Sequence, residues 1–181
     1  MRIIAGHWKG TRLHAPTGTA IRPTADRLRE AIFSIIGSRI RDKRVLDLFA
    51  GTGAMGLEAL SRGALHATFI DQSAKALALI RRNIAKLDAA ERAAVIRWDI
   101  SHNLDCLDAR GGFDWIFIDP PYGRGLGVRT LTRLAAAGVE YGRIVVEHGA
   151  KDPLAPLPLA LRLTDQRRYG KTLVSFLSPV V

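Results

Sequence analysis

The chain has 181 residues, a length that suits one domain, residues 1–181. It has a single cysteine, which excludes an internal disulfide. The formal net charge of +10 and the sequence pI of about 10.6 favour a polyanionic partner. No histidine and cysteine cluster has zinc spacing, and no segment has the pattern of a signal peptide or a membrane span. We therefore expect no metal, no membrane partner and a cytoplasmic location.

The basic charge gathers at the amino terminus. Residues 1–44 hold ten lysines and arginines against three acids, a net charge of +7. We predict a short basic hairpin-helix extension over this range, with Thr24 as the helix N-cap, Leu28 and Ile32 on the buried side, and Arg29 outside. A merely solvated helix face is the alternative to contact with the phosphates of such a partner. The residues predicted to bind it are Lys9, Arg12, Arg22, Thr24, Arg27 and Arg29.

A glycine-rich turn follows the first predicted central strand. Val45–Phe49 is an apolar run broken by one acid, which is typical of a strand buried on both faces of a parallel sheet. Gly51–Gly56 then leads into a helical stretch, Leu57–Arg62, and small residues at such a turn let the backbone approach a ligand closely. Asp71 closes the next strand about 20 residues further on, the offset of an acid that binds a ribose. NAD and S-adenosylmethionine both fit, and a purely structural turn is the alternative.

A second turn, Asp119-Pro120-Pro121-Tyr122, ends the strand predicted over Phe113–Ile118. Two prolines stop the strand and leave the carboxylate facing the crevice beyond its carboxyl end. The exocyclic amine of a nucleobase is a poor nucleophile. A carboxylate and the Pro120 carbonyl can accept its two N–H groups while Tyr122 stacks on the extruded base. This turn favours S-adenosylmethionine and methyl transfer to a planar amine; the alternative is a plain proline turn with Tyr122 as a core ring.

The rest of the chain alternates strands and helices. We predict further strands near Ala67, Val95 and Ile144, helices over 74–87 and 126–137, and a closing hairpin over 161–163 and 172–177. This order predicts an α/β, Rossmann-like fold with a mostly parallel, doubly wound, seven-stranded sheet that has one antiparallel strand. Cys106 is interpreted as a small buried hydrophobe, and a role for His148 in the site stays open.

Several motifs together resemble one family. They are the glycine run, Asp71, Asp99, the Asp119 turn, and the segments Ile21–Phe33, Arg2–Gly6 and Arg168–Gly170. Along nearly its whole length the chain resembles the bacterial 16S ribosomal RNA guanine-N2 methyltransferase (RsmD) family of class I methyltransferases. The resemblance implies the class I methyltransferase fold and S-adenosylmethionine as cofactor, with S-adenosylhomocysteine as product. It also implies a monomer that methylates the N2 amine of a guanine, of the guanine-966 type, in ribosomal RNA within a small-subunit particle.

The resemblance assigns roles to individual residues. Asp47 would lie near the methionine ammonium, although it could instead orient the loop through backbone hydrogen bonds. Asp71 would bind the ribose hydroxyls, and Asp99 the adenine amine unless it is an ordinary turn acid. The target guanine would meet Asp119, Pro120, Pro121 and Tyr122. The full set predicted to bind cofactor is Asp47, Phe49, Ala50, Gly51, Thr52, Gly53, Gly56, Asp71, Gln72, Asp99 and Ile100.

Three other functions fit parts of the pattern. The chain could be an amino methyltransferase that acts on another RNA, a DNA base or a protein glutamine. It could be an NAD-dependent oxidoreductase, although no acid/base pair suited to hydride transfer stands near the proline turn. It could also be a non-catalytic RNA-binding module that keeps the fold and ignores both cofactors.

Overall fold

The structure is a computed structural model that describes residues 1–16, 23–107 and 111–180, with side chains from residue 25 onward in the second range. Its helices are α1 (Pro23–Ile36), α2 (Ala54–Ser61), α3 (Ala74–Lys86) and α4 (Leu126–Ala136), with short 3₁₀ turns η1 (Gly37–Ile40), η2 (Ala90–Arg92) and η3 (Asp105–Leu107). Its strands are β1 (Arg44–Leu48), β2 (His66–Asp71), β3 (Ala93–Arg97), β4 (Phe113–Ile118), β5 (Tyr141–Gly149), β6 (Leu161–Tyr169) and β7 (Thr172–Pro179).

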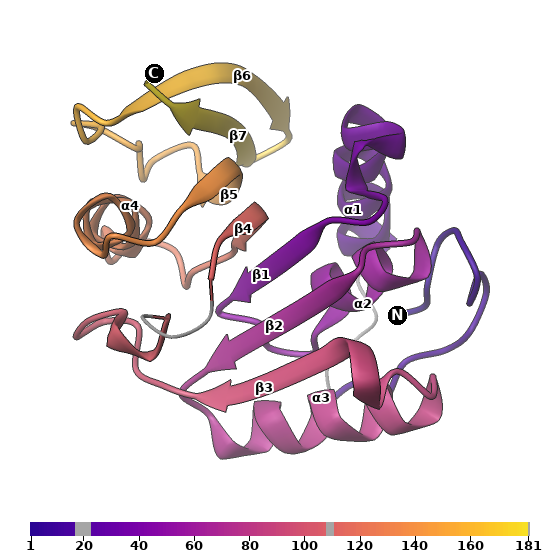
Figure 1. The fold of residues 1–181 in the computed structure, drawn as a ribbon. Coiled ribbons are helices and arrows are strands. Elements are labelled where there is room, and N and C mark those ends of the chain that lie inside the picture. The colour runs from indigo at the N-terminus through magenta and orange to yellow at the C-terminus, as the bar shows by residue number, and fades with distance from the viewer. Residues whose placement is uncertain (17–22, 108–110, 181) are drawn as a thin grey trace.

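Within the described ranges these strands form a seven-stranded sheet in the order β3-β2-β1-β4-β5-β7-β6 (Figure 1). The strands β1 to β5 pair in parallel, and β7 runs antiparallel to both β5 and β6. The chain moves outward from β1 to β3 and then returns to β4 on the other side of β1. The prediction of a mostly parallel, doubly wound sheet with one antiparallel strand is confirmed. The reversal beside β1 is the place where sheets of this kind bind ligands.

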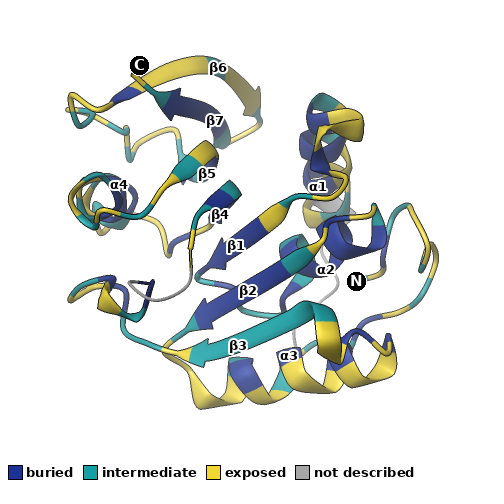
Figure 2. Cartoon of the chain, viewed as in Figure 1, coloured by how far each residue is buried: buried dark blue, intermediate teal, exposed yellow. Residues whose placement is uncertain are grey.

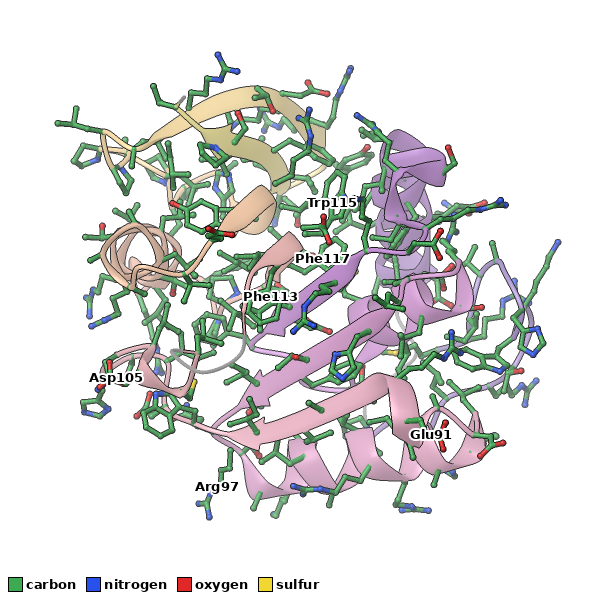
Figure 3. The ribbon with its side chains drawn as sticks, in the orientation of Figure 1. Glu91, Arg97, Asp105, Phe113, Trp115 and Phe117 are labelled. Atoms are coloured by element: carbon green, nitrogen blue, oxygen red, sulfur yellow. The ribbon has the colours of Figure 1, made fainter. Side chains whose placement is uncertain are left out.

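Helices cover both faces of the sheet. The helices α1, α2 and α3 lie on one face and α4 on the other (Figure 1). Neighbouring residues of one strand enter different cores: Val45 packs with the α1 to α3 side, and Leu46 packs with α4. Trp115 and Phe117 of β4 belong to the core beneath α1 (Figure 3). The inner strands β1 and β2 are largely buried, whereas the edge strand β6 is mostly exposed (Figure 2).

The amino-terminal segment folds back as a minimal hairpin against this core. One isolated bridge joins Arg2 to Arg12, and backbone hydrogen bonds link Ile3 with Thr11 and Gly10. The predicted hairpin is therefore present as a single bridge. Buried polar side chains hold it in place. Glu58 of α2 accepts the Ile4 and Ala5 amides at 2.8 and 3.0 Å, and Asn83 of α3 binds the His14 amide at 2.7 Å.

Two helix starts differ from the prediction. The helix α1 begins at Pro23, so Thr24 lies inside it and the expectation of an N-cap at Thr24 is wrong. Proline suits the first helical position because it has no N–H to leave unpaired. The helix α2 begins at Ala54, three residues before the predicted Leu57, because Gly53 adopts a left-handed conformation (φ 75°) and ends the turn there.

Candidate active site

A cavity of about 1170 Å³ lies where the carboxyl ends of the parallel strands meet α1. It brings together the β1–α2 turn, the ends of β2 and β3, the proline turn after β4, and one residue of β5. All four predicted turn residues line it, and so do most of the residues predicted to bind cofactor. The predicted residues that line it are Asp47, Phe49, Ala50, Gly51, Thr52, Asp71, Gln72, Asp99, Ile100, Asp119, Pro120, Pro121 and Tyr122.

Gly53 and Gly56 shape the turn from behind and do not line the cavity. A side chain at Gly56 would place its Cβ 2.3 Å from the Phe69 ring, so glycine here lets α2 pack closely on β2. Gly53 is the N-cap of α2, and its amide donates to the Ala50 carbonyl at 2.7 Å. Phe49 has a positive φ of 59°, which is rare for a non-glycine residue. Close packing and this backbone hydrogen bond thus fix the conformation of the β1–α2 turn beside the cavity.

Asp71 ties the glycine turn to the start of α3. Its Oδ2 accepts the Gly51 amide at 2.9 Å, and its Oδ1 accepts the Ser73 amide at 2.8 Å. Each carboxylate oxygen has a second lone pair, so these bonds leave acceptor capacity toward the cavity. Ser73 in turn caps α3 by accepting the Ala76 amide.

Asp47 is almost fully buried on the cavity floor. Its Oδ2 accepts a hydrogen bond from the Gly56 amide at 2.9 Å. This is a backbone hydrogen bond of the kind expected if Asp47 orients the loop. Burial, with a smaller contribution from the charge of Asp71, raises the pKa of Asp47 to about 7. A cation placed beside Asp47 would favour its ionised form.

Asp99 stands in a turn just past β3. Its Oδ1 accepts the Ser101 amide at 2.9 Å, and its Oδ2 lies 3.0 Å from Nδ1 of His102. The hydrogen bonds from Ser101 and the nearby His102 lower the pKa of Asp99, so this carboxylate stays ionised at neutral pH. Asp99 therefore stabilises its own turn, as an ordinary turn acid does, and it also lines the same cavity.

The proline turn presents an unpartnered carboxylate. Among the residues that the structure describes, Asp119 accepts no hydrogen bond and pairs with no cation, although solvent reaches it through the cavity. Asp119 is exposed at the cavity surface, and the walls of the cavity exclude part of the solvent around it. This desolvation, together with the charges of Glu147 and Asp47, raises the pKa of Asp119 to about 8. A bound cation would favour the ionised form of Asp119, and its full acceptor capacity would then be available to a ligand.

Tyr122 is not a core ring, so that alternative is wrong. Its side chain is 47% exposed and lies against Gly149, where an added Cβ would approach the ring at 3.6 Å. Its hydroxyl donates to Oε1 of Glu147 at 2.7 Å and lies 3.2 Å from the Thr172 hydroxyl. The ring therefore stands at the cavity wall in a fixed orientation.

Glu147 was missed by sequence reasoning, which considered its neighbour His148 instead. Successive residues of a strand point to opposite faces, and here Glu147 lines the cavity. His148 points away: it is buried, with Nδ1 at 3.0 Å from the Asp152 carbonyl and Nε2 at 2.9 Å from the Ser175 hydroxyl. The only signal in the sequence was an acid that directly follows the apolar pair Val145-Val146.

The residues predicted to bind RNA divide into three groups. Lys9, Arg12 and Arg27 are exposed. The expectation that Arg29 points outward is wrong: it is 3% exposed, 3.0 Å from Asp26 and 3.5 Å from Glu58, and it also donates to the Arg2 carbonyl. Its guanidinium joins α1 to α2 and to the hairpin. Arg22 and the side chain of Thr24 lie outside the described residues.

Comparison with known proteins agrees with this geometry. A family model described as conserved hypothetical protein 95 matches residues 1–178. The chain belongs to this family, the RsmD family. A putative rRNA methyltransferase, YlbH of Bacillus subtilis, is 39% identical over 175 residues, which is 95% of each chain. The ribosomal RNA small subunit methyltransferase D of Escherichia coli is 37% identical over 174 residues, covering 94% of this RsmD-family chain and 86% of the relative.

Solved structures show the same fold. The putative methyltransferase yhhF from Escherichia coli has a TM-score of 0.85 at 34% identity. The matched region covers 99% of this chain and 97% of the yhhF chain. A putative RNA methyltransferase from Pyrococcus horikoshii shares the fold with a TM-score of 0.65 at 15% identity. The prediction of a Rossmann-like class I methyltransferase fold is confirmed for this RsmD-family member.

Membrane-spanning helices and clustered metal ligands are both absent from the described part of the chain. No helix in residues 1–16, 23–107 and 111–180 has the length and apolarity to cross a membrane. Nor do three or more histidine, cysteine, aspartate or glutamate side chains of these ranges lie grouped so that they could hold a metal ion.

Proposed function

We propose that this protein transfers a methyl group from S-adenosylmethionine to the exocyclic N2 amine of a guanine in 16S ribosomal RNA. One observation carries the proposal: the unpartnered carboxylate of Asp119 shares a cavity with the glycine turn of a methyltransferase fold. Membership of the RsmD family supports it, as do relatives named for ribosomal RNA methylation. We propose that the acceptor is a guanine of a small-subunit particle and that the enzyme acts as a monomer.

The chemistry of the cavity fits the cofactor. S-adenosylmethionine supplies a methyl group on a positively charged sulfonium, and it also carries an ammonium, a ribose and an adenine. Asp47 and Asp119 line the same cavity, and the charge of Asp47 contributes to the raised pKa of Asp119, so a cation bound between or beside them would relieve that repulsion. Gly51 and Thr52 offer close backbone approach, Asp71 has lone pairs for the ribose hydroxyls, and Asp99 stays ionised for the adenine amine.

The proline turn would prepare the acceptor. Asp119 and the Pro120 carbonyl accept the two N–H groups of the amine, which turns its lone pair away from the ring and toward the methyl group. Both acceptors also stabilise the positive charge that develops on nitrogen during transfer. The methylated amine is acidic and loses its extra proton to Asp119 or to water. Most of the rate enhancement then comes from positioning and charge complementarity, without a strong base.

Methyl transfer to defined acceptors tests the proposal. Tritium-labelled S-adenosylmethionine is offered with 16S ribosomal RNA, small-subunit particles, DNA and protein, and the labelled RNA is digested for nucleoside mass spectrometry. We expect label in ribosomal RNA, recovered as N2-methylguanosine. Label in DNA or in glutamine would replace this function with another amino methylation. Stabilisation by NADH and not by S-adenosylhomocysteine in a thermal-shift assay would indicate an oxidoreductase.

A further inference from the structure

Two carboxylates face the acceptor end of the cavity. Asp119 follows β4, Glu147 lies on the neighbouring strand β5, and both line the same hollow. Ile118 of β4 lies opposite Val146 of β5, so Asp119 and Glu147 directly follow a paired position on neighbouring strands. One acceptor group is sufficient to hold one N–H of an amine. A second carboxylate beside the first can accept a hydrogen bond from a second donor on the ligand.

Glu147 is held so that part of it remains free. The Tyr122 hydroxyl donates to its Oε1 at 2.7 Å, and no described residue hydrogen-bonds to its Oε2. Thr172 of β7, at 3.2 Å from the same tyrosine hydroxyl, supports the arrangement from the next strand. This second oxygen is therefore available to a ligand in the cavity.

The amino-bearing bases differ in the group next to the amine. Beside the N2 amine of guanine stands N1–H, which is a donor. Beside the N6 amine of adenine stands N1, and beside the N4 amine of cytosine stands N3, and both of these are acceptors. A carboxylate at that point attracts guanine and repels the other two bases. Unpaired or repelled polar groups in a partly buried site produce large discrimination.

We propose that Glu147 accepts a hydrogen bond from N1–H of the target base and thereby makes the site specific for guanine. This inference rests on the proposed function and assigns its base specificity to one residue. Asp119 holds the reacting amine, Glu147 reads the neighbouring ring nitrogen, and Tyr122 both orients Glu147 and offers its ring to the base. No covalent step passes through Glu147, so it determines specificity and is not a catalytic residue.

A base analogue tests the inference directly. The target guanine in an acceptor RNA or reconstituted particle is replaced by 2-aminopurine, which keeps the amine at position 2 but has an acceptor at N1. Wild-type enzyme should prefer guanine strongly in kcat/KM. The Glu147→Gln variant can donate its amide N–H to N1 of 2-aminopurine, so the ratio of kcat/KM for guanine to that for 2-aminopurine should fall by about tenfold or more. Comparing this ratio between enzymes cancels the different intrinsic reactivity of the two amines.

The matched control is Glu140→Gln. Glu140 is exposed, directly precedes β5 and does not line the cavity, so the same chemical change there should leave the ratio at the wild-type value. Affinity for S-adenosylhomocysteine, measured calorimetrically, shows whether each variant has folded. An unchanged ratio in a folded Glu147→Gln variant would overturn the inference. So would a wild-type enzyme that methylates 2-aminopurine as well as guanine, a result that needs no variant.

Failure of the proposed function gives a different result. In that case wild-type enzyme transfers no methyl group to guanine N2 in any acceptor, and there is no ratio to compare. If guanine N2 is methylated and the ratio does not depend on residue 147, only the role of Glu147 is refuted.

Discussion

At the residue scale, the cavity shows how the surroundings of a carboxyl group set its pKa. Burial raises the pKa of Asp47, and partial desolvation together with the charges of Glu147 and Asp47 raises that of Asp119. Burial also raises the pKa of Glu147, although the hydrogen bond from Tyr122 opposes the shift. Hydrogen bonds lower the pKa of Asp99 at the rim. Asp47, Asp119 and Glu147 are therefore the carboxylates of the cavity whose charge is least stabilised without a bound cation.

We predict that the Asp47→Asn variant is more stable relative to wild type at pH 8 than at pH 5. An unfolded aspartate has a pKa of about 3.9, and in the folded protein the pKa of Asp47 is about 7. The folded state holds this proton more tightly, so the stabilisation is complete below the unfolded pKa and disappears as the pH rises through the folded one. Asparagine avoids the buried charge and can still accept the Gly56 amide. The melting temperature of cofactor-free protein, measured at both pH values, should show a difference of several degrees.

The control is Asp42→Asn. Asp42 is exposed and has a φ of 58°, a conformation that asparagine tolerates well, so the same removal of charge should shift the melting temperature equally at both pH values. A pH-independent effect of Asp47→Asn would contradict the raised pKa of this buried group.

At the element scale, the turns that follow β1 and β4 could be predicted from the sequence. Which side chains of a strand face the cavity could not. Gly51 and the Pro120-Pro121 pair carry local signals, because glycine permits a positive φ and proline stops a ladder. In β5 the apolar run Ile144–Val146 is buried on both faces, so the sequence does not tell whether Glu147 or its successor faces the ligand. Only the pairing with neighbouring strands decides this.

Arg29 illustrates the same limit for a helix. Its position on α1 suggested an outward side chain, but the partner that draws it inward is Glu58 of α2, which is far away in the sequence. Glu58 also holds the hairpin through two backbone amides. An acid in an apolar helix segment indicates a buried polar network, yet the sequence does not identify its partners.

At the scale of the whole molecule, the uneven charge predicts how RNA binding depends on salt. Residues 1–44 carry a net charge of +7, and Lys9, Arg12 and Arg27 are exposed there. We predict that replacing these three with glutamine weakens RNA binding and reduces the slope of log K against log salt by about 0.7 to 0.9 for each phosphate that the variant no longer neutralises. Affinity for S-adenosylhomocysteine should not change. Filter binding or fluorescence anisotropy over a range of salt concentrations measures the slope.

The control removes equal charge from α3, by glutamine at Lys75, Arg81 and Arg82, which are exposed and do not line the cavity. This control should keep a slope close to that of wild type. Equal slopes for all three proteins would contradict a specific role of the amino-terminal segment in binding RNA.

The central claim is that Asp119 binds the acceptor amine while the methyl donor occupies the glycine-lined part of the cavity. The most direct measurement is the single-turnover methylation rate of the Asp119→Ala variant, taken together with its dissociation constant for S-adenosylhomocysteine, which lacks the sulfonium charge. We predict a rate about 10² to 10³ times lower than wild type, with the dissociation constant nearly unchanged. A rate close to wild type, or a weakening of affinity that accounts for the slower rate, would contradict the claim.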